Sequence, residues 1–382
     1  MNLLVTALSA ATGPSGICRH AYNLVRCATR REEISRVTLV VGKWQEPYFR
    51  GSFRLDHAKA DVISANISND PFSRNLWYLR ELPRLAADLR ADVVHLSFPV
   101  PVQRRSLLCP VVVSLHDLYP YDEPDNFGFP RVFFNRVFLH QCLKQVDCIA
   151  CVSEATLSRL KARFPRFAHR KAVVVPNCVT IHSIEPELPA SELGRFLLIV
   201  AQHRSNKNIP LAIKVFEELW HRGKIDKNAI MLLLGNYGPE TATIMALIKR
   251  RALEKRVRLK IGVSDGELRW LYENCDLLMA PSWTEGFGLP AVEGLFCGSR
   301  VVCSDISAFR EVGGQACHYF DLHATSGTSA MFEAACNALA EPARRAKGLE
   351  RFALENVAKE YSALYSQLVE DWVDVITTCK TE

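Results

Sequence analysis

Two glutamates mark the stretch of this 382-residue chain with the clearest potential for chemistry. Glu285 and Glu293 lie within Pro281–Asp305, which reads PSWTEGFGLPAVEGLFCGSRVVCSD. The first falls in a predicted loop and the second one turn inside the helix that follows it. Each carboxylate has two oxygens that accept hydrogen bonds from hydroxyl groups. The pair therefore predicts a site for a polyhydroxyl ligand such as a sugar, with solvated helix charges as the alternative interpretation.

The same stretch predicts a helix start that can bind an anion. Pro290 suits the first helical position. Gly286 and Gly288, just before it, leave bare backbone N–H groups at the positive end of that helix. Short apolar runs at Asp276–Ala280 and Arg300–Cys303 predict the strands on either side.

Cationic side chains follow another predicted strand, Phe196–Ala201. Arg204 and Lys207 lie in the turn Gln202–Asn208, before a helix that begins near Ile209. Arginine presents a planar fork of donors and lysine a point charge, so the two can clamp a diphosphate. Solvated loop charge is the alternative interpretation.

Polar residues and glycine also stand at predicted strand ends in the first half. His116 and Asp117 come at the end of the predicted strand Val111–His116, and ligands of open α/β sheets bind at the carboxyl ends of strands. Gly16 follows the predicted strand Leu3–Leu8, where a loop must turn tightly and let the backbone approach a phosphate. A structural histidine and an ordinary turn glycine are the alternatives.

Short β-rich runs alternate with helical stretches along the chain, which predicts an α/β fold built on parallel sheets. The other predicted strands are Val37–Val41, Asp92–Leu96, Asp147–Val152, Ala172–Val175 and Met231–Gly235. Cys148 and Cys151 have the spacing of a redox or metal motif. They lie on a predicted strand, however, where residues three apart point to opposite faces, so we expect neither role.

The run Glu-Gly-Phe-Gly-Leu-Pro, with its second glutamate, resembles the signature of the retaining family-4 glycosyltransferases. The resemblance implies the GT-B architecture, in which two Rossmann-like domains face each other across a deep cleft. Weaker similarity runs over the whole chain and includes the His-Asp pair at 116–117 and the Lys-Asn pair at 207–208. One departure is that some relatives carry the arginine five positions before the lysine, where this chain has Gln202.

The resemblance implies a role for each candidate residue. Glu285 is expected to hold hydroxyls of the donor sugar and Glu293 the ribose. Lys207 and Arg204 would contact the diphosphate, and His116 would orient the transferred sugar. The expected catalytic residues are His116, Glu285, Arg204 and Lys207, and the expected donor-binding residues are Gly16, Asp117, Gly286, Phe287, Gly288, Leu289 and Glu293.

The implied reaction moves a hexose from a nucleoside-diphosphate sugar to a hydroxyl of a glycan or lipid-linked acceptor, with retention at the anomeric carbon. Mannose is the first expectation for the sugar, and assembly of a cell-surface polysaccharide or lipopolysaccharide is the expected context. No cofactor and no metal are expected, because the family lacks a metal-binding Asp-x-Asp motif and this sequence also lacks one. A nucleotide-sugar 2-epimerase of the same architecture and a non-catalytic nucleotide-sugar-binding protein are the alternatives.

The length of the chain predicts two domains. We expect an acceptor-side domain over residues 1–185, a nucleotide-sugar-binding domain over 195–360, and a terminal helix over 361–382 that crosses back to the first domain. Residues 181–193, with two prolines, read as the linker. No apolar run approaches the roughly 20 residues of a spanning helix, and residues 1–9 lack the basic start of a signal peptide. A cytoplasmic location, extending to the inner face of the cell membrane, is therefore expected.

Basic residues are concentrated in the first half. Residues 1–190 carry 24 Lys and Arg against 17 Asp and Glu, whereas the remainder carries 23 against 24. Within the first half, Phe127–Phe138 contains five phenylalanines and two arginines. Aromatic rings interleaved with arginine suit contact with an anionic membrane, and packing in the core is the alternative. No nucleic-acid-binding motif accompanies the basic excess.

Overall fold

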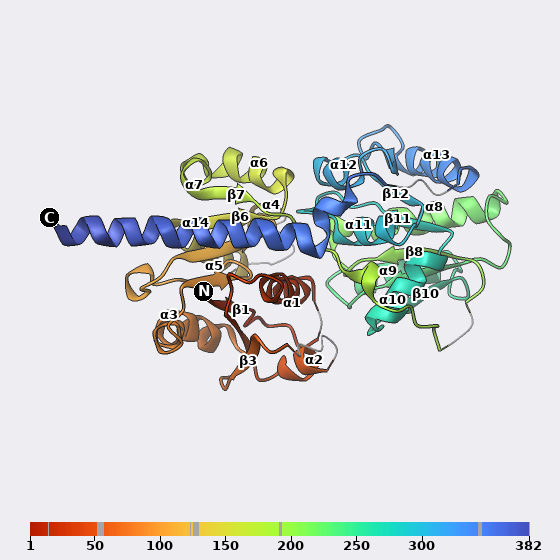
Figure 1. Ribbon diagram of the computed structural model, residues 1–382. Coiled ribbons are helices and arrows are strands. Elements are labelled where there is room, and N and C mark those ends of the chain that lie inside the picture. Colours follow the sequence, from red (N-terminus) through yellow and green to blue (C-terminus); the bar gives the residue numbers. More distant parts are fainter. Residues whose placement is uncertain are drawn as a thin grey trace. The chain divides into compact units, whose positions relative to one another are not determined.

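The computed structural model describes residues 1–13, 15–51, 57–122, 124, 130–190, 193–342 and 346–381. The chain forms two compact units, which Figure 1 shows as ribbons. The first unit contains Met1–Cys178 and Arg351–Glu382, and the second contains Val179–Glu350. The chain therefore leaves the first unit once and returns to it for the terminal helix.

A parallel sheet forms the centre of the first unit. Within the described residues it has seven strands in the order β3-β2-β1-β4-β5-β6-β7, and every pair of neighbours is parallel. The strands are β1 (Asn2–Thr6), β2 (Arg36–Gly42), β3 (Ala60–Ala65), β4 (Val93–Leu96), β5 (Val111–Leu115), β6 (Cys148–Cys151) and β7 (Ala172–Val174).

Helices pack on both faces of this sheet (Figure 1). One buried cluster joins the sheet to α1 and α14, and the other joins it to α3, α5 and α6. Cys148 belongs to the first cluster and Cys151 to the second, so the prediction that they face opposite sides of β6 is confirmed. The helices are α1 (Gly16–Thr29), α2 (Glu46–Arg50), α3 (Pro71–Asp88), α4 (Tyr119–Asp122), α5 (Arg131–Gln145), α6 (Glu154–Arg163), α7 (Pro165–Lys171) and α14 (Leu354–Thr381).

The second unit repeats this plan. Its described sheet has six parallel strands in the order β10-β9-β8-β11-β12-β13. The strands are β8 (Phe196–Val200), β9 (Ile230–Leu234), β10 (Val257–Lys260), β11 (Leu277–Ala280), β12 (Val301–Ser304) and β13 (Cys317–Phe320). Helices α8, α9 and α13 share one buried cluster with the sheet. The helices are α8 (Ile209–His221), α9 (Thr241–Arg250), α10 (Asp265–Asn274), α11 (Leu289–Phe296), α12 (Ser307–Gly313) and α13 (Gly327–Ala340).

All the strands that the sequence predicted are present, but β3, β10 and β13 were not predicted. Each of the three is an edge strand of its sheet. A central strand of a parallel sheet is covered on both faces and reads as a continuous apolar run, whereas an edge strand need not. The sequence of β10, Val-Arg-Leu-Lys, and that of β13, Cys-His-Tyr-Phe, show this difference.

The unit boundaries fall earlier than the sequence indicated. Residues 179–185 belong to the second unit, where the 3-10 turn Ile181–Ser183 contacts α10 and α11. Residues 351–360 belong to the first unit, because α14 begins at Leu354 and packs along α1. The terminal helix is thus longer than the predicted stretch that began at residue 361.

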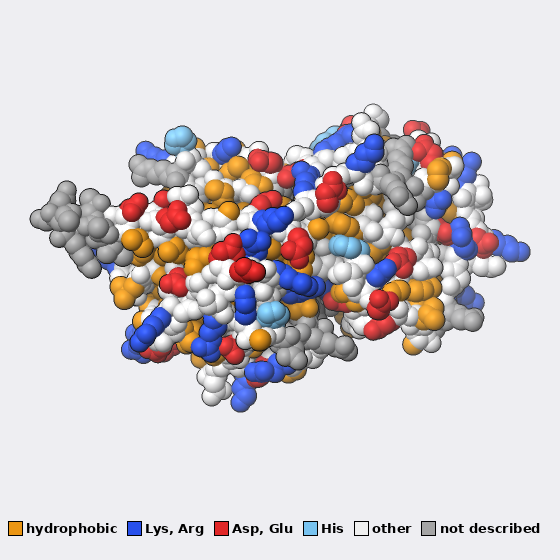
Figure 2. Space-filling view, viewed as in Figure 1, with side chains coloured by type: hydrophobic (Ala, Val, Ile, Leu, Met, Phe, Trp, Pro, Cys, Tyr) orange, Lys and Arg blue, Asp and Glu red, His pale blue; other side chains and the backbone are white. Residues whose placement is uncertain are grey.

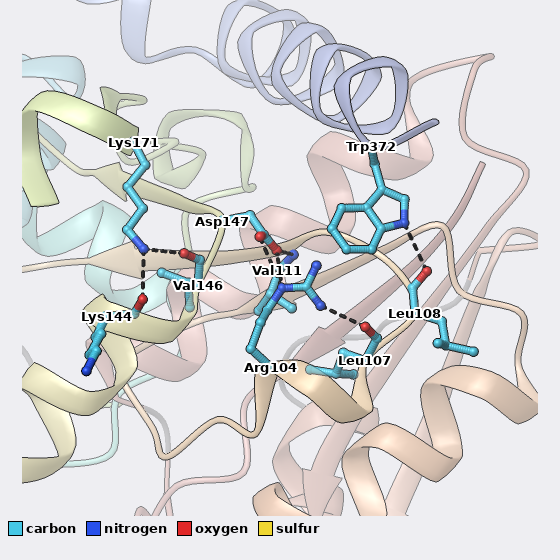
Figure 3. Close-up of polar contacts among 9 residues, drawn as sticks. All are labelled: Arg104, Leu107, Leu108, Val111, Lys144, Val146, Asp147, Lys171 and Trp372. Atoms are coloured by element: carbon cyan, nitrogen blue, oxygen red, sulfur yellow. Dashed lines mark hydrogen bonds and ion pairs between the residues drawn. The ribbon is translucent and has the colours of Figure 1, made fainter. Parts of the chain in front are cut away.

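Trp372 connects the C-terminal half of α14 to the rest of the first unit through polar contacts (Figure 3). Its indole N–H donates a 3.1 Å hydrogen bond to the carbonyl oxygen of Leu108, and the Arg104 guanidinium lies 4.3 Å from the centre of its ring. Arg104 is held by Asp147, whose Oδ2 lies 2.9 Å from Nε. A cation over an indole face is attracted by the ring quadrupole, so this contact supplies polar as well as apolar attachment.

No helix of the described residues is both long enough and apolar enough to cross a membrane.

Candidate active site

Lys207 and Glu285 meet in the second unit. Lys207 Nζ lies 2.6 Å from Glu285 Oε1, and the Ser282 hydroxyl donates a 2.8 Å hydrogen bond to the same oxygen. The Lys207 side chain is 20% exposed and the Glu285 side chain 13%. Such partial burial strengthens the attraction relative to a surface pair, because less water screens the charges.

Parallel pairing of β8 with β11 brings these two residues together. Lys207 follows β8 and Glu285 follows β11, and the carboxyl ends of neighbouring parallel strands lie at the same edge of the sheet. Asn206 connects the loop after β8 to the loop after β11 by two hydrogen bonds. Its carbonyl oxygen accepts a 2.8 Å hydrogen bond from the Trp283 N–H, and its side-chain amide donates to the Thr284 carbonyl at 3.4 Å. Asn206 is thus a positioning residue that no sequence pattern indicated.

The turn before α11 requires glycine at its last position. Gly288 has a φ of 87°, in the left-handed region, and a Cβ on it would lie 2.7 Å from the Phe309 ring. Helix α11 begins at Leu289, so the prediction that Pro290 takes the first helical position is wrong by one residue, and Pro290 takes the second. Proline is tolerated there because the N–H groups of the first turn have no acceptor within the helix. The positive end of the helix dipole at this start is suited to an anion.

Glu293 lies in the second turn of α11 and is only 4% exposed. Its Oε2 accepts a 2.9 Å hydrogen bond from the hydroxyl of Tyr272, a fully buried residue of α10. The tyrosine fixes the orientation of the carboxylate without neutralising its charge. Tyr272 is therefore a second positioning residue that the sequence motif did not include.

A small recess lies at the edge of the sheet where these loops meet. Its lining includes Lys207, Ser282, Glu285, Pro290 and Phe309, together with the ends of β8 and β11. A cation, a carboxylate and a helix start thus share one recess within the second unit. This combination can hold an anion beside a hydroxyl-bearing group.

Within the second unit, the other residues predicted for the donor come from the same two loops or from the first residue of α11. Arg204 is half-buried and precedes the 3-10 turn that ends at Lys207. Gly286 and Leu289 are half-buried, whereas Phe287 is only 4% exposed. Because the Phe287 ring is packed inside the unit, we expect its backbone and not its side chain to face a ligand.

In the first unit, Gly16 is the first residue of α1, and Ser15 caps that helix with its hydroxyl. Gln45 supports the loop before the helix. It is fully buried, its amide donates a 3.0 Å hydrogen bond to the Ala7 carbonyl, and its Oε1 accepts one of 2.8 Å from the Gly42 N–H. Gln45 therefore positions the glycine-bearing loop, although nothing in the local sequence singles it out.

His116 follows β5 and is fixed by its ring and its main chain. Its Nε2 lies 2.9 Å from the Ser97 carbonyl oxygen, and its own carbonyl accepts a 3.2 Å hydrogen bond from the Thr156 hydroxyl. A carbonyl can only accept, so Nε2 carries the proton and Nδ1 is the acceptor of the neutral ring. The Asp117 carboxylate accepts a 3.0 Å hydrogen bond from the Tyr119 N–H and so shapes the turn into α4.

Two histidines that the sequence analysis did not single out lie near His116. The His20 ring packs edge-on against it with centroids 4.5 Å apart, and the His95 ring lies 6.5 Å from His20. Burial lowers the pKa of all three rings, to about 3 for His95. Repulsion from His116 and His95 lowers the pKa of His20 further. All three are therefore neutral near pH 7.

The described residues include no group of three or more His, Cys, Asp or Glu arranged to hold a metal ion.

Two family models match adjoining parts of the chain. The model described as Glycosyltransferase Family 4 matches residues 14–183, and the model described as Glycosyl transferases group 1 matches residues 182–329. The chain belongs to the family-4 glycosyltransferases. The resemblance inferred from the two glutamates is confirmed at the level of the family.

Similar curated glycosyltransferases include enzymes named for the O antigen. The mannosyltransferase RfbU of Salmonella typhimurium is 26% identical over 310 residues, which is 78% of this chain and 82% of RfbU. O-antigen chain mannosyltransferase B of Escherichia coli is 27% identical over 215 residues, which is 54% of this chain and 55% of that protein. The match thus spans about half the length of the second relative.

Solved glycosyltransferase structures share the fold of this chain. Sucrose-phosphate synthase of Thermosynechococcus elongatus matches with a TM-score of 0.73 at 16% identity, covering 97% of this chain and 99% of that structure. The glycosyltransferase WaaG matches with a TM-score of 0.65 at 16% identity, covering 98% and 99%. Together with the two parallel sheets, these matches confirm the GT-B fold class.

The neutral histidines predict a loss of stability as the pH falls below 6.5. In the unfolded chain each regains a pKa near 6.5, so the unfolded state binds more protons than the folded state below that pH, down to about pH 3 for His95. The free energy of unfolding should fall in this window by up to about 1.4 kcal/mol per pH unit for each histidine. Urea unfolding at pH 5, 6 and 7.5 measures this dependence.

In a His95→Gln variant the free energy of unfolding should depend less steeply on pH than in the wild type. The reduction in slope should correspond to about one proton fewer taken up on unfolding. His169→Gln, a change of an exposed histidine, is the matched control and should leave the dependence unaltered. An identical dependence in His95→Gln and wild type would contradict the assignment of a neutral buried ring.

Proposed function

We propose that this glycosyltransferase moves a hexose from a nucleoside-diphosphate sugar to a hydroxyl of a glycan or lipid-linked acceptor, with retention at the anomeric carbon. Mannose is the proposed sugar, and assembly of a cell-surface polysaccharide is the proposed context. The names of RfbU and mannosyltransferase B, both O-antigen enzymes, support this choice. WaaG, involved in lipopolysaccharide biosynthesis, and Anabaena HepE, solved with UDP and glucose, have the same fold and support the context and the type of donor.

The ion pair of Lys207 and Glu285 beside the start of α11 is the observation that carries the proposal. Negative charge accumulates on a nucleoside diphosphate as its bond to the sugar breaks. A cation that is already in place stabilises this charge without reorganisation, and the N–H groups of a helix start add to its effect. Arg204, three residues earlier in the same loop, is the proposed second cation.

The two glutamates have different proposed roles. Glu285, which lines the recess, would hold hydroxyls of the transferred sugar. Glu293, fixed by Tyr272, would hold the ribose. We assign neither as a nucleophile, since in the proposed reaction the acceptor attacks from the face that the diphosphate leaves. His116 would accept a hydrogen bond from a hydroxyl of the transferred sugar through Nδ1.

Metal independence is part of the proposal. In many sugar transferases a divalent cation offsets the charge of the leaving diphosphate, whereas here Lys207, Arg204 and the start of α11 would do so. Both side-chain cations lie in the loop after β8.

Contact of the first unit with an anionic membrane is the last part of the proposal. The side chains of Phe133, Phe134 and Val137 on α5 are 56%, 50% and 44% exposed, so the two rings and the valine do not lie in the core. Arg131 and Arg163 are exposed as well. Rings among lipid headgroups and guanidiniums on phosphates form a favourable combination.

Phe127 and Phe129, which the sequence analysis grouped with this segment, lie outside the described residues. On the face drawn in Figure 2, basic and acidic side chains are interspersed over the first unit. The proposed contact therefore depends on the exposed rings of α5 and not on a continuous basic surface on that face.

Replacing Lys207 tests the proposed function directly. Lys207→Ala should lower kcat/KM by a factor of about 10² or more, because a charge contact made in the transition state is lost. Release of nucleoside diphosphate from GDP-mannose, with a polysaccharide or lipid-linked acceptor, is the measurement. Arg222→Ala, which breaks an exposed ion pair at the far end of α8, is the control and should retain activity. Equal turnover of Lys207→Ala and wild type would contradict the proposal.

Chelation tests metal independence. The wild-type enzyme should keep full activity in excess EDTA, because side-chain cations offset the charge of the leaving group. Rates with and without EDTA, and after addition of Mg²⁺ or Mn²⁺, are the measurement. A tenfold loss in EDTA that either metal restores would refute this part of the proposal.

The exposed rings of α5 should be needed for membrane contact but not for folding. Changing Phe133, Phe134 and Val137 together to Ser should leave Tm nearly intact and abolish sedimentation with anionic phosphatidylglycerol vesicles. Phe72→Ser, a change of another phenylalanine that is 75% exposed in the same unit, is the control and should still sediment. Because charges are screened beyond about 8 Å at physiological salt, binding should weaken as salt rises. Wild-type protein that fails to bind these vesicles at low salt would exclude the contact.

A further inference from the structure

A continuous chain of hydrogen bonds crosses the interior of the first unit from α14 to the loop after β7. Its links join Tyr365 to His95 at 2.6 Å, His95 to Ser114 at 2.8 Å, Ser114 to His20 at 2.7 Å and His20 to Asn177 at 2.8 Å. Tyr365, His95 and Ser114 are no more than 1% exposed, and His20 is 6% exposed. Polar groups in such a position are costly unless every one is satisfied, so an extended polar chain in a core calls for an explanation.

The direction of each hydrogen bond follows from the last link. Asn177 Oδ1 can only accept, so His20 donates through Nδ1–H and its Nε2 must accept from the Ser114 hydroxyl. The hydroxyl oxygen then accepts from His95 Nε2–H, and His95 Nδ1 accepts from the Tyr365 phenol. A single tautomer of each ring satisfies the whole chain.

With these directions, one hydrogen-bonding group after β7 and one after β5 remain available for a ligand. With Oδ1 occupied by His20, the amide Nδ2 of Asn177 has no hydrogen-bond acceptor among the residues that the structure describes. His116, in edge contact with His20, donates through Nε2, and no described residue donates to its Nδ1. A donor and an acceptor therefore belong to two residues that both contact the fixed ring of His20.

The main chain around Asn177 is fixed as well. Asn23, one turn after His20 on α1, donates a 2.8 Å hydrogen bond to the carbonyl oxygen of Cys178. Helix α1 thus holds the segment after β7 through a side chain and through the backbone. Such double support is what a precisely oriented binding group requires.

We propose that Asn177 is a further sugar-binding residue of this enzyme, whose amide donates to a sugar oxygen, and that the chain through Tyr365, His95, Ser114 and His20 positions it. The ligand class is a pyranose, whose hydroxyls both donate and accept. Asn177 Nδ2 and His116 Nδ1 offer the two complementary groups. The inference rests on the proposed function, and the pyranose belongs either to the donor or to the acceptor.

Asn177→Asp separates binding from support. Aspartate retains an oxygen for His20 Nδ1–H, so the hydrogen-bond chain is preserved, but it removes the N–H donor. We expect Asn177→Asp and Asn177→Ala to lose about tenfold or more in kcat/KM, as for one hydrogen bond to substrate, with Tm of the aspartate variant near that of wild type. Asn274→Asp, the same change at an exposed site on α10, is the control.

Binding measurements identify the source of the sugar. Calorimetric titration with GDP alone should give the same affinity in wild type and Asn177→Asp. Weaker binding of GDP-mannose assigns the contact to the donor sugar, whereas unchanged donor binding with a raised acceptor KM assigns it to the acceptor. Wild-type kinetics in Asn177→Asp, or an equal loss of GDP affinity, would overturn the inference.

Ser114→Ala tests the positioning residues. It breaks the chain between His95 and His20, and it should change the same kinetic parameter as Asn177→Ala, by a smaller factor. A lowered Tm with unaltered kinetics would show that the chain is only structural. Lys207→Ala keeps the two proposals apart: if it retains full turnover the proposed function fails, whereas its loss of activity beside a fully active Asn177→Asp defeats only the present inference.

Discussion

Parallel strand pairing is the constraint on which the rest of this structure depends. Every pairing between neighbouring strands of the two sheets runs in the same direction, so loops from distant parts of the sequence meet at the carboxyl edge. Lys207 and Glu285 are 78 positions apart and form one ion pair at such an edge. His20 and Asn177 are 157 positions apart and share one hydrogen bond. Polar residues that are far apart in the sequence therefore lie close together in space.

The two edges fix their polar groups by different physical means. At Lys207 and Glu285, opposite charges are paired in partial burial, where less water screens their attraction. Around His20 and His95, burial keeps the rings neutral and directional hydrogen bonds set their orientation. The first arrangement suits a site that must receive a highly charged diphosphate. The second suits recognition of a neutral sugar, where the position of one proton decides which group donates.

Site residues that belong to a short continuous pattern could be predicted from the sequence, whereas residues that act through partners from other segments could not. The glutamates, the glycine turn and the cationic loop each form a compact pattern, so Glu285, Gly288 and Lys207 were found in advance. Asn206 and Gln45 were missed, because their role depends on partners from other loops. His20 and His95 were missed for the same reason. A recognisable pattern of neighbouring residues, and neither residue type nor the distance between partners, separates the two groups: Lys207–Glu285 and Asn206–Thr284 are both 78 positions apart.

The discontinuous first unit affects the order in which the protein can fold as it is synthesised. The second unit is one continuous segment and can complete its contacts before α14 leaves the ribosome. The first unit cannot, since Tyr361 and Tyr365 complete the buried cluster that α1 begins, and the Cys27–Leu354 contact spans 327 positions. Until then, one apolar face of the first sheet is left without its final cover. Nascent chains that stall before residue 354 should therefore be strong clients for chaperones that bind exposed apolar surface.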